Sequence, residues 1–422
     1  MFYGIFPDNR NLKFVGMKTD YNMDLRAWNT FGMKVSCACF VEYGTVEELE
    51  GLWKMRHGMS PDGLPSPFLH IGRGSNLLFT KDFPGTVFHS DIRFISVLDG
   101  TGHQYQPGDS AAETCADLAS DGKVSVEAGA GVLWDDFCLW CAERGLWGPE
   151  NLSGIPGEVG AAAVQNIGAY GVEAKDIISQ VKCFDCVTGR RVAFKASECG
   201  YGYRDSMFKD SAKGRYVVTS VVFTLSSAPV LRLDYGHVKE AVNAAFETVS
   251  GPDVPDVAAP GTDVGKSGQD SAVGHGKGVS AGEGSLSPML VRNVILSIRN
   301  AKLPDPAVIG SAGSFFKNPV IPRSDYERIA SVARIEHGAD YEVPHYDAGS
   351  GFIKVPAAWL LDQCGLKGLV AGNAGIYEKQ PLVIVNLTGN ASPSEILAVE
   401  AMAVKAVYEK FGVTLHPEVE HV

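Results

Sequence analysis

Residues 151–173 read NLSGIPGEVGAAAVQNIGAYGVE, a composition that favours a loop lying against a ligand. Between residues 154 and 171, five residues are glycine and fourteen are small or apolar. So much glycine disfavours a helix, by up to ~1 kcal/mol for each glycine. Glycines at these spacings also let backbone N–H groups approach an anion such as a pyrophosphate. We therefore expect ligand contact here, with close packing of chain segments as the alternative.

A second glycine-rich turn, GRGSN at 72–76, follows a short apolar strand at 68–71. It is not a G-x-G-x-x-G dinucleotide fingerprint, because Leu77 occupies the sixth position. The sequence leaves open whether this is a simple turn or another ligand contact.

Three polar side chains outside these turns could carry chemistry. Arg204, in YGYRDS, suggests a rigid cation near a planar ligand, with a surface ion pair to Asp205 as the alternative. Ser314, in GSAGSFFKNP, lacks the G-x-S-x-G of a nucleophile elbow, so proton donation is as plausible as nucleophilic attack. Glu418 follows a proline near the C-terminus, and an isolated glutamate is usually solvated.

The composition is that of a globular protein with two or three domains. The 422 residues include 37 Lys+Arg and 49 Asp+Glu, a net charge of −12. This acidic balance argues against general nucleic-acid affinity but allows a local basic pocket for a phosphorylated small molecule. No run approaches 18 apolar residues and no secretory signal is evident, so we expect no membrane insertion and a cytoplasmic location.

Nine cysteines, an odd number, also fit a reducing compartment. Two Cys-x-x-Cys pairs occur, Cys138/Cys141 in a predicted helix and Cys183/Cys186 in a predicted strand. Positions i and i+3 of a strand point to opposite faces, so the second pair cannot chelate as written. We therefore predict no zinc site.

The remaining pattern alternates strands and helices. Thr45 and Glu48 form a capping box that begins a helix, and Ser392 with Glu395 begins another that stops at Gly412. We also predict a strand at 124–129, a helix at 132–145, a hairpin at 179–195, a strand at 215–225, helices at 237–248 and 288–300 and a strand at 382–386. The first 25 residues suggest a loose extension.

Residues 251–288 differ from their surroundings. Eighteen of these 38 residues are Gly, Ser or Pro, and none is aromatic. They cannot bury enough apolar area to offset their ordering entropy, so we predict a disordered insertion. The segment GTDVGKS at 261–267 has too few residues between its glycines, and no preceding strand, to be a P-loop.

In this order, the motifs resemble the UDP-N-acetylenolpyruvoylglucosamine reductase family of peptidoglycan synthesis. The resemblance rests on NTFG (29–32), GRGSNLLF (72–79), the segment 151–173, GYRDSMFK (202–209), KLPDPAVIGSAGSFFKNPV (302–320), WLLDQCGLKG (359–368) and HPEVE (416–420). It implies an α+β architecture in which an FAD-binding domain of two α+β subdomains is joined to a smaller α+β substrate-binding domain. The corresponding ranges are an extension at 1–24, the FAD-binding domain at 25–228, the substrate-binding domain at 229–412 and a tail at 413–422 that returns to the active site.

The resemblance also implies a monomer with a two-step reaction. NADPH reduces non-covalently bound FAD, and the enolpyruvyl group of the UDP-sugar then takes the hydride and forms an enolate-like species. Arg204 would face the developing charge, Ser314 would supply the proton, and Glu418 would complete the network.

Binding residues carry over position by position. The implied FAD contacts are Gly72, Arg73, Gly74, Ser75, Asn76, Ile155, Pro156, Gly157, Gly160, Ala161, Asn166, Gly168, Ala169 and Tyr170. The implied substrate contacts are Tyr235, Lys302, Asn318 and Gln363.

The sequence departs from the family pattern in the insertion, in the long N-terminal extension and in Glu420-His421, where a basic and an aromatic residue are more usual. Two other functions stay open on the residues alone. One is a flavin oxidoreductase acting on a 2-hydroxy acid or sugar lactone, and the other is a nucleotide-binding module without catalysis.

Overall fold

The structure, a computed structural model, describes residues 17–54, 64–98, 122–250 and 286–422. Most of the predicted insertion, from 251 to 285, lies outside the described residues. The predicted insertion does not extend to 288, because Pro288 already opens helix α5 (Pro288–Lys302), with Ser287 as its N-cap.

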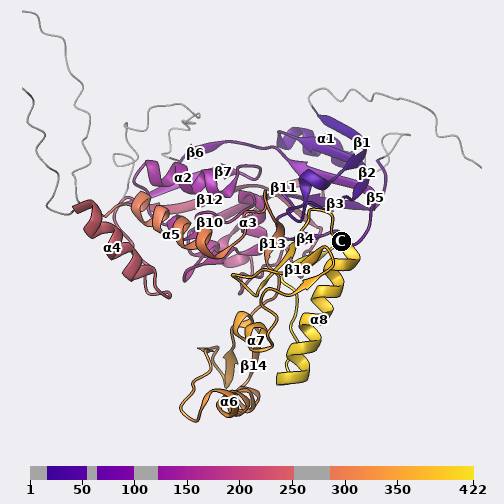
Figure 1. Cartoon of the computed structure of the whole chain (residues 1–422). Helices are drawn as coiled ribbons and strands as arrows, with labels where there is room; N and C mark the ends of the chain where they lie inside the picture. The colour runs from indigo at the N-terminus through magenta and orange to yellow at the C-terminus, as the bar shows by residue number, and fades with distance from the viewer. Residues whose placement is uncertain (1–16, 55–63, 99–121, 251–285) are drawn as a thin grey trace, which may run out of the picture.

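The first sheet has the order β1-β2-β5-β3 (Figure 1). Its strands are β1 (Lys18–Asp24), β2 (Ser36–Tyr43), β5 (Phe83–Ser90) and β3 (Phe68–Ile71), and helix α1 (Val46–Lys54) follows β2. Strands β2 and β3 both run parallel to β5, while β1 is antiparallel to β2. The prediction of a loose extension is wrong for residues 18–24, because β1 gains a full ladder from the neighbouring strand.

The second sheet is antiparallel throughout, in the order β11-β10-β12-β7-β6. These strands are β11 (Arg190–Lys195), β10 (Ile178–Asp185), β12 (Tyr216–Ser226), β7 (Lys123–Gly129) and β6 (Ile95–Val97). Helix α2 (Trp134–Glu143) packs on it through Trp134 and Phe137, whose rings lie 6.0 and 4.4 Å from that of Phe223. The hairpin, strands and helix predicted between 124 and 225 are confirmed.

The glycine-rich segment was expected to disfavour a helix, but its residues 159–165 form helix α3 (Val159–Gln165). Its Gly160 has a backbone so close to Ala130 that an added Cβ would lie 2.9 Å from the Ala130 Cβ. Glycine at this position therefore lets the helix pack closely on the second sheet. This packing outweighs the low helix propensity of glycine.

Helices α4 (Val238–Ser250) and α5 pack together beside α2 (Figure 1). Asp135 of α2 accepts two hydrogen bonds from the Arg292 guanidinium, at 2.5 and 2.7 Å. Helix α5 thus packs against α2, which covers the second sheet, and the division of the chain into domains stays a prediction.

The C-terminal part is a separate α+β layer. One sheet contains β13 (Gly310–Ser314), β19 (Val383–Asn386), β18 (Ala374–Ile376) and β17 (Val370–Ala371), and a smaller one contains β14 (Val320–Pro322), β16 (Phe352–Lys354) and β15 (Tyr346–Asp347). The helices are α6 (Arg323–His337), α7 (Ala357–Gln363) and α8 (Pro393–Phe411). The predicted capping box of α8 and its end at Gly412, with φ +66°, are confirmed.

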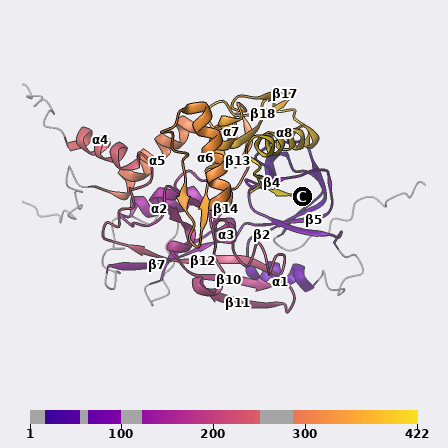
Figure 2. The same ribbon diagram turned by 90° about the horizontal axis from the view of Figure 1, so that it is seen from below.

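The C-terminal tail crosses back to the first part of the chain. Strand β20 (Glu420–His421) pairs in parallel with β4 (Leu77–Leu78), directly after the GRGSN turn. Figure 2 shows α7 and α8 on one side of the molecule and β10 and β11 on the other, with α3 and β4 between them. The tail therefore brings the last residues to the turn at 72–76. Among the residues described, no helix is long and apolar enough to cross a bilayer.

Candidate functional site

A cavity of about 580 Å³ separates the first sheet from α3 and the second sheet. The turn at 72–76 forms one wall, and Gly160, Ala161 and Val164 of α3 form another. Lys209 and Lys213 add positive charge. The cavity thus offers glycine-rich backbone together with cations, which suits a dinucleotide with a pyrophosphate.

The turn at 72–76 requires glycine at position 74. Gly74 has φ +65°, and a Cβ there would lie 2.0 Å from the Trp28 carbonyl oxygen. Ser75 Oγ donates to the Pro156 carbonyl at 3.1 Å, which ties this turn to the second glycine-rich segment. The two segments that the sequence singled out separately therefore form one continuous wall.

The residues present fit FAD. Gly72 and Gly74 of the turn expose backbone to the cavity, and Lys209 lies nearby, which provides a cradle for the pyrophosphate; the cavity is also large enough for extended rings.

A smaller cavity of about 140 Å³ adjoins the first, and Ser75, Asn76, Glu158, Ala161 and Gln165 line both. The predicted catalytic residues Arg204, Ser314 and Glu418 all line this smaller cavity, together with Arg299. They come from three separate parts of the chain, so only the tertiary structure brings them together.

Arg204 is held in one orientation. Its residue has φ +55°, its Nη2 donates to the Gly168 carbonyl at 2.5 Å, and its Nε lies 3.0 Å from Glu418 Oε1. Asp205, the alternative partner, instead accepts a hydrogen bond from the Ser206 backbone N–H at 3.0 Å. Arg204 is therefore part of the cavity wall and not one half of a surface pair with Asp205.

Ser314 ends β13 with its side chain exposed to the cavity. The preceding Gly313 has φ +71°. The next residue, Phe315, is fully buried, and its carbonyl accepts the Glu418 backbone N–H at 2.7 Å. The tail is thereby fixed beside Ser314. Glu418 is not a solvated glutamate, because its side chain is only 14% exposed.

Glu420 and His421 complete the anchoring of the tail. Glu420 forms an ion pair with Lys213 at 2.5 Å, and His421 lies 3.2 Å from Glu400 of α8 and packs against Phe315. Asn76 Nδ2 donates to the Glu418 carbonyl at 3.1 Å. The departure in the tail motif therefore leaves the position of Glu418 well supported.

The four predicted substrate residues, all within the described part of the chain, do not line the smaller cavity. They are Tyr235, Lys302, Asn318 and Gln363. Asn318 Nδ2 donates to the Tyr203 hydroxyl at 3.4 Å, and the Tyr235 ring lies 6.2 Å from that of Tyr170. Lys302 is exposed at the end of α5.

Gln363 and Asn166 have other partners. Gln363 Oε1 lies 2.5 Å from His337 Nε2 on α6. Asn166 is fully buried, and its amide donates to Glu173 and to the Gly202 carbonyl. Among the described residues that line the two cavities, Asn166, Ala169 and Tyr170 are absent, whereas the other predicted FAD contacts are present.

Sequence reasoning missed Arg299, which lines the smaller cavity from α5 and donates to the Gly154 carbonyl at 3.0 Å. Burial lowers the pKa of Arg299, while Tyr170 and Asp135 act to raise it. The seven-residue spacing between Arg292 and Arg299 was a usable signal, because it places both on one helix face.

Family models match most of the chain. The FAD binding domain model covers residues 38–195, and the C-terminal domain model of UDP-N-acetylenolpyruvoylglucosamine reductase covers residues 305–422.

Whole-chain relatives agree. A UDP-N-acetylenolpyruvoylglucosamine reductase of Bacteroides fragilis is 40% identical over 399 residues, covering 94% of this chain and 98% of the relative. One of Chromobacterium violaceum is 38% identical over 398 residues, covering 94% and 97%. The crystal structure of the reductase from Thermus caldophilus is 21% identical, with a TM-score of 0.54 and coverage of 96% and 98%, which supports the fold.

Proposed function

The chain belongs to the UDP-N-acetylenolpyruvoylglucosamine reductase family, and on this premise we propose how its residues carry out the reaction. It is an FAD-dependent oxidoreductase that reduces UDP-N-acetylenolpyruvoylglucosamine in peptidoglycan synthesis. The finer proposal is that NADPH is the reductant and that Arg204, Ser314 and Glu418 act on the enolpyruvyl group.

The turn at 72–76 and the segment from 155 to 161 would hold FAD, which would supply the hydride transfer between NADPH and the enolpyruvyl group. The two cavities share a wall, which supports adjacent sites for the cofactor in the larger cavity and the substrate in the smaller one. Ser75 and Asn76 lie at this boundary, where they would orient the two reactants.

Arg204 stabilises the negative charge that develops beside the substrate carboxylate. Its guanidinium is kept in place by Gly168 and Glu418, so little reorganisation is needed when the charge appears. Arg299 adds a second cation to the same cavity wall. The cavity therefore favours the enolate form.

Ser314 delivers the proton. Among the hydrogen bonds of the described residues none involves its hydroxyl, which leaves that group available to a substrate atom. A serine is a weak acid, but an enolate is strongly basic, and the Arg204 cation would stabilise the serine oxyanion until water returns a proton to it. The convergence of these three side chains on one cavity carries this proposal.

Anaerobic spectroscopy tests the proposal. NADPH should bleach the purified yellow protein, and UDP-N-acetylenolpyruvoylglucosamine should restore the colour. Bleaching by a 2-hydroxy acid or sugar lactone would favour the other flavin oxidoreductase, and protein that takes up no FAD would favour a binding module. The monomeric state and the cytoplasmic location stay predictions, which gel filtration and cell fractionation would test.

A further inference from the structure

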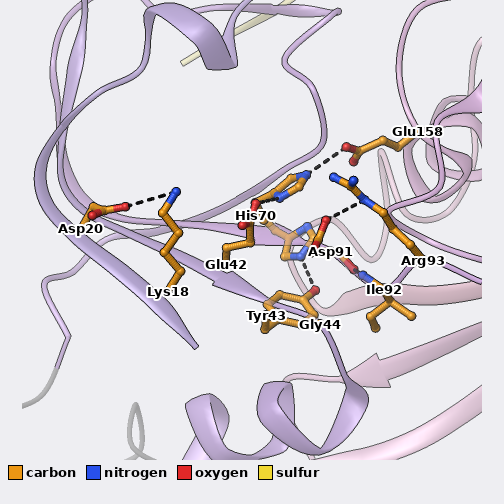
Figure 3. A network of polar contacts seen from close by, with 12 residues as sticks. Lys18, Asp20, Glu42, Tyr43, Gly44, His70, Asp91, Ile92, Arg93 and Glu158 are labelled. Atoms are coloured by element: carbon orange, nitrogen blue, oxygen red, sulfur yellow. Dashed lines mark hydrogen bonds and ion pairs between the residues drawn. The ribbon is translucent and has the colours of Figure 1, made fainter. Parts of the chain in front are cut away.

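A buried histidine on β5 lies between two carboxylates, and its neighbours Phe88 and Ser90 line the larger cavity. His89, on β5, is fully buried. Its Nδ1 lies 2.9 Å from Glu42 Oε2, and its Nε2 lies 2.9 Å from Glu158 Oε1. The proposed chemistry does not use any of these three groups. Figure 3 shows Glu42 and Glu158 of this network; His70, which is also labelled there, instead contacts the Tyr43 hydroxyl at 2.5 Å.

The two carboxylates belong to different parts of the fold. Glu42 is on β2, the neighbour of β5 in the first sheet, so its contact with His89 stays within that sheet. Glu158 is the N-cap residue of α3, which packs on β12 of the second sheet. The Nε2 contact of His89 therefore joins the two walls of the cavity.

The imidazole has little freedom to turn. Its ring lies 4.5 Å from the Trp28 ring and stacks on Phe40 at 6.4 Å. Two contacts of 2.9 Å between ring nitrogens and carboxyl oxygens each need one proton. Each ring nitrogen therefore has a carboxyl partner, and the two contacts together fix the orientation of the ring.

Glu158 transmits this contact to the cofactor turn. A Cβ added to Gly72 would lie 3.0 Å from Glu158 Oε2, so the carboxylate packs directly against the turn at 72–76. Glu158 also lines both cavities. A shift of this side chain would move the turn and the N-terminus of α3 relative to each other.

We propose that His89 is a positioning residue for the cofactor: through Glu158 it holds the N-terminus of α3 against the first sheet and so fixes the width of the FAD cavity. This inference rests on FAD binding by the wild-type protein. It assigns to His89 no contact with FAD or substrate.

Two substitutions separate the two contacts of His89. The amide nitrogen of glutamine reaches the position of Nε2, and that of asparagine reaches the position of Nδ1. His89→Gln should keep the Glu158 contact and bind FAD within about threefold of wild type, whereas His89→Asn should lose at least about tenfold in affinity. The measurement is the FAD dissociation constant from flavin fluorescence, with circular dichroism to verify folding.

Glu42→Ala and Glu158→Ala test the same two contacts by removing the carboxylates in place of the histidine. Each removes one partner of His89, but only Glu158→Ala breaks the contact between the cavity walls, so it should weaken FAD binding more. Equal losses in His89→Gln and His89→Asn, or wild-type affinity in both, would overturn the proposal. If His89→Asn does not fold, equal affinities in the two alanine variants would overturn it instead. A wild-type protein that binds no FAD would count against the proposed function and not against this inference alone.

Discussion

Arg204 Nε lies 3.0 Å from Glu418 Oε1, which joins a turn of the FAD-binding part to the C-terminal tail. The contact exists because β20 runs beside β4 and places Glu418 next to Phe315. A charged pair that is mostly shielded from water and also lines a cavity is a candidate for substrate chemistry.

Arg204→Lys should keep FAD and the yellow colour but lose at least about tenfold in the substrate half-reaction. Lysine offers one mobile point charge, whereas the planar guanidinium is held by a hydrogen bond to the Gly168 carbonyl and an ion pair with Glu418. The measurement is stopped-flow reoxidation of reduced flavin by UDP-N-acetylenolpyruvoylglucosamine without oxygen.

Arg191→Lys is the matched control. Arg191 pairs with Glu47 and Glu50 on the surface, where an ion pair is worth only ~0–1 kcal/mol. The control should reoxidise as fast as wild type. Equal rates in Arg204→Lys and in wild type would exclude a catalytic role of the guanidinium and favour Lys302 or Arg299 as the working cation.

Ser314→Ala should leave flavin reduction by NADPH unchanged and slow reoxidation by substrate by ~10²-fold or more. The hydroxyl is assigned only to protonation of the enolate-like species. Without that proton the hydride transfer can reverse, so net reoxidation slows while reduction by NADPH does not involve the serine. Separate stopped-flow measurements of the two half-reactions test this. Ser311→Ala, in the same strand but buried, is the control and should affect neither half. Equal slowing of both halves in Ser314→Ala would mean that this residue positions the flavin.

Replacing residues 251–285 by a short Gly/Ser linker should leave FAD content and turnover nearly unchanged, since loop length changes the closure entropy by only ~0.6 kcal/mol per doubling. A deletion extended to 288 should lower the melting temperature, because the Ser287 side chain accepts the Leu290 N–H at 3.2 Å and such a cap is worth ~1 kcal/mol. Calorimetry of both deletions checks this. Loss of FAD from the shorter deletion would contradict it.

Asp135→Asn should destabilise the protein at pH 7 by about 1–3 kcal/mol, because it leaves the buried Arg292 without its carboxylate. Burial acts to raise the pKa of Asp135, but hydrogen bonds from Arg292 and Gly154 outweigh it, so that pKa is lowered. A lowered pKa contributes stability that is present above the unfolded value near 3.8 and is lost as the pH falls through the folded value.

Denaturant unfolding of wild type and Asp135→Asn at pH 7 and near pH 3 measures the effect. The difference between them should be largest at pH 7 and shrink in acid. If the difference in unfolding free energy between the two proteins is the same at both pH values, the charge of the Asp135 carboxylate does not contribute to stability.

The sequence by itself determined the local structure and the residues to watch. Strand alternation at 179–195, the capping box at Ser392 and the helix stop at Gly412 are local signals, and each is confirmed. The turn at 72–76 was also identifiable, because only glycine tolerates φ +65° at Gly74 with a carbonyl 2.0 Å from its Cβ position.

The local sequence pattern gave wrong predictions where tertiary packing outweighs the secondary-structure propensity of a segment. Residues 18–24 form β1 because β2 supplies hydrogen bonds that the sequence of the segment does not reveal. Helix α3 forms despite Gly160 because that glycine allows close contact with Ala130. In both cases the deciding partner is distant along the chain.

Only the tertiary structure decided which polar groups meet. Arg204 has Asp205 beside it in sequence, yet its guanidinium pairs with Glu418, because β20 and β4 bring the tail across the molecule. The position of Arg299 in the same cavity and the bond from His89 to Glu158 have the same origin. Contacts of this kind depend on how the sheets and helices are placed relative to one another. That placement is set by the packing of buried apolar side chains from the whole chain, so it cannot be predicted from the local spacing of residues.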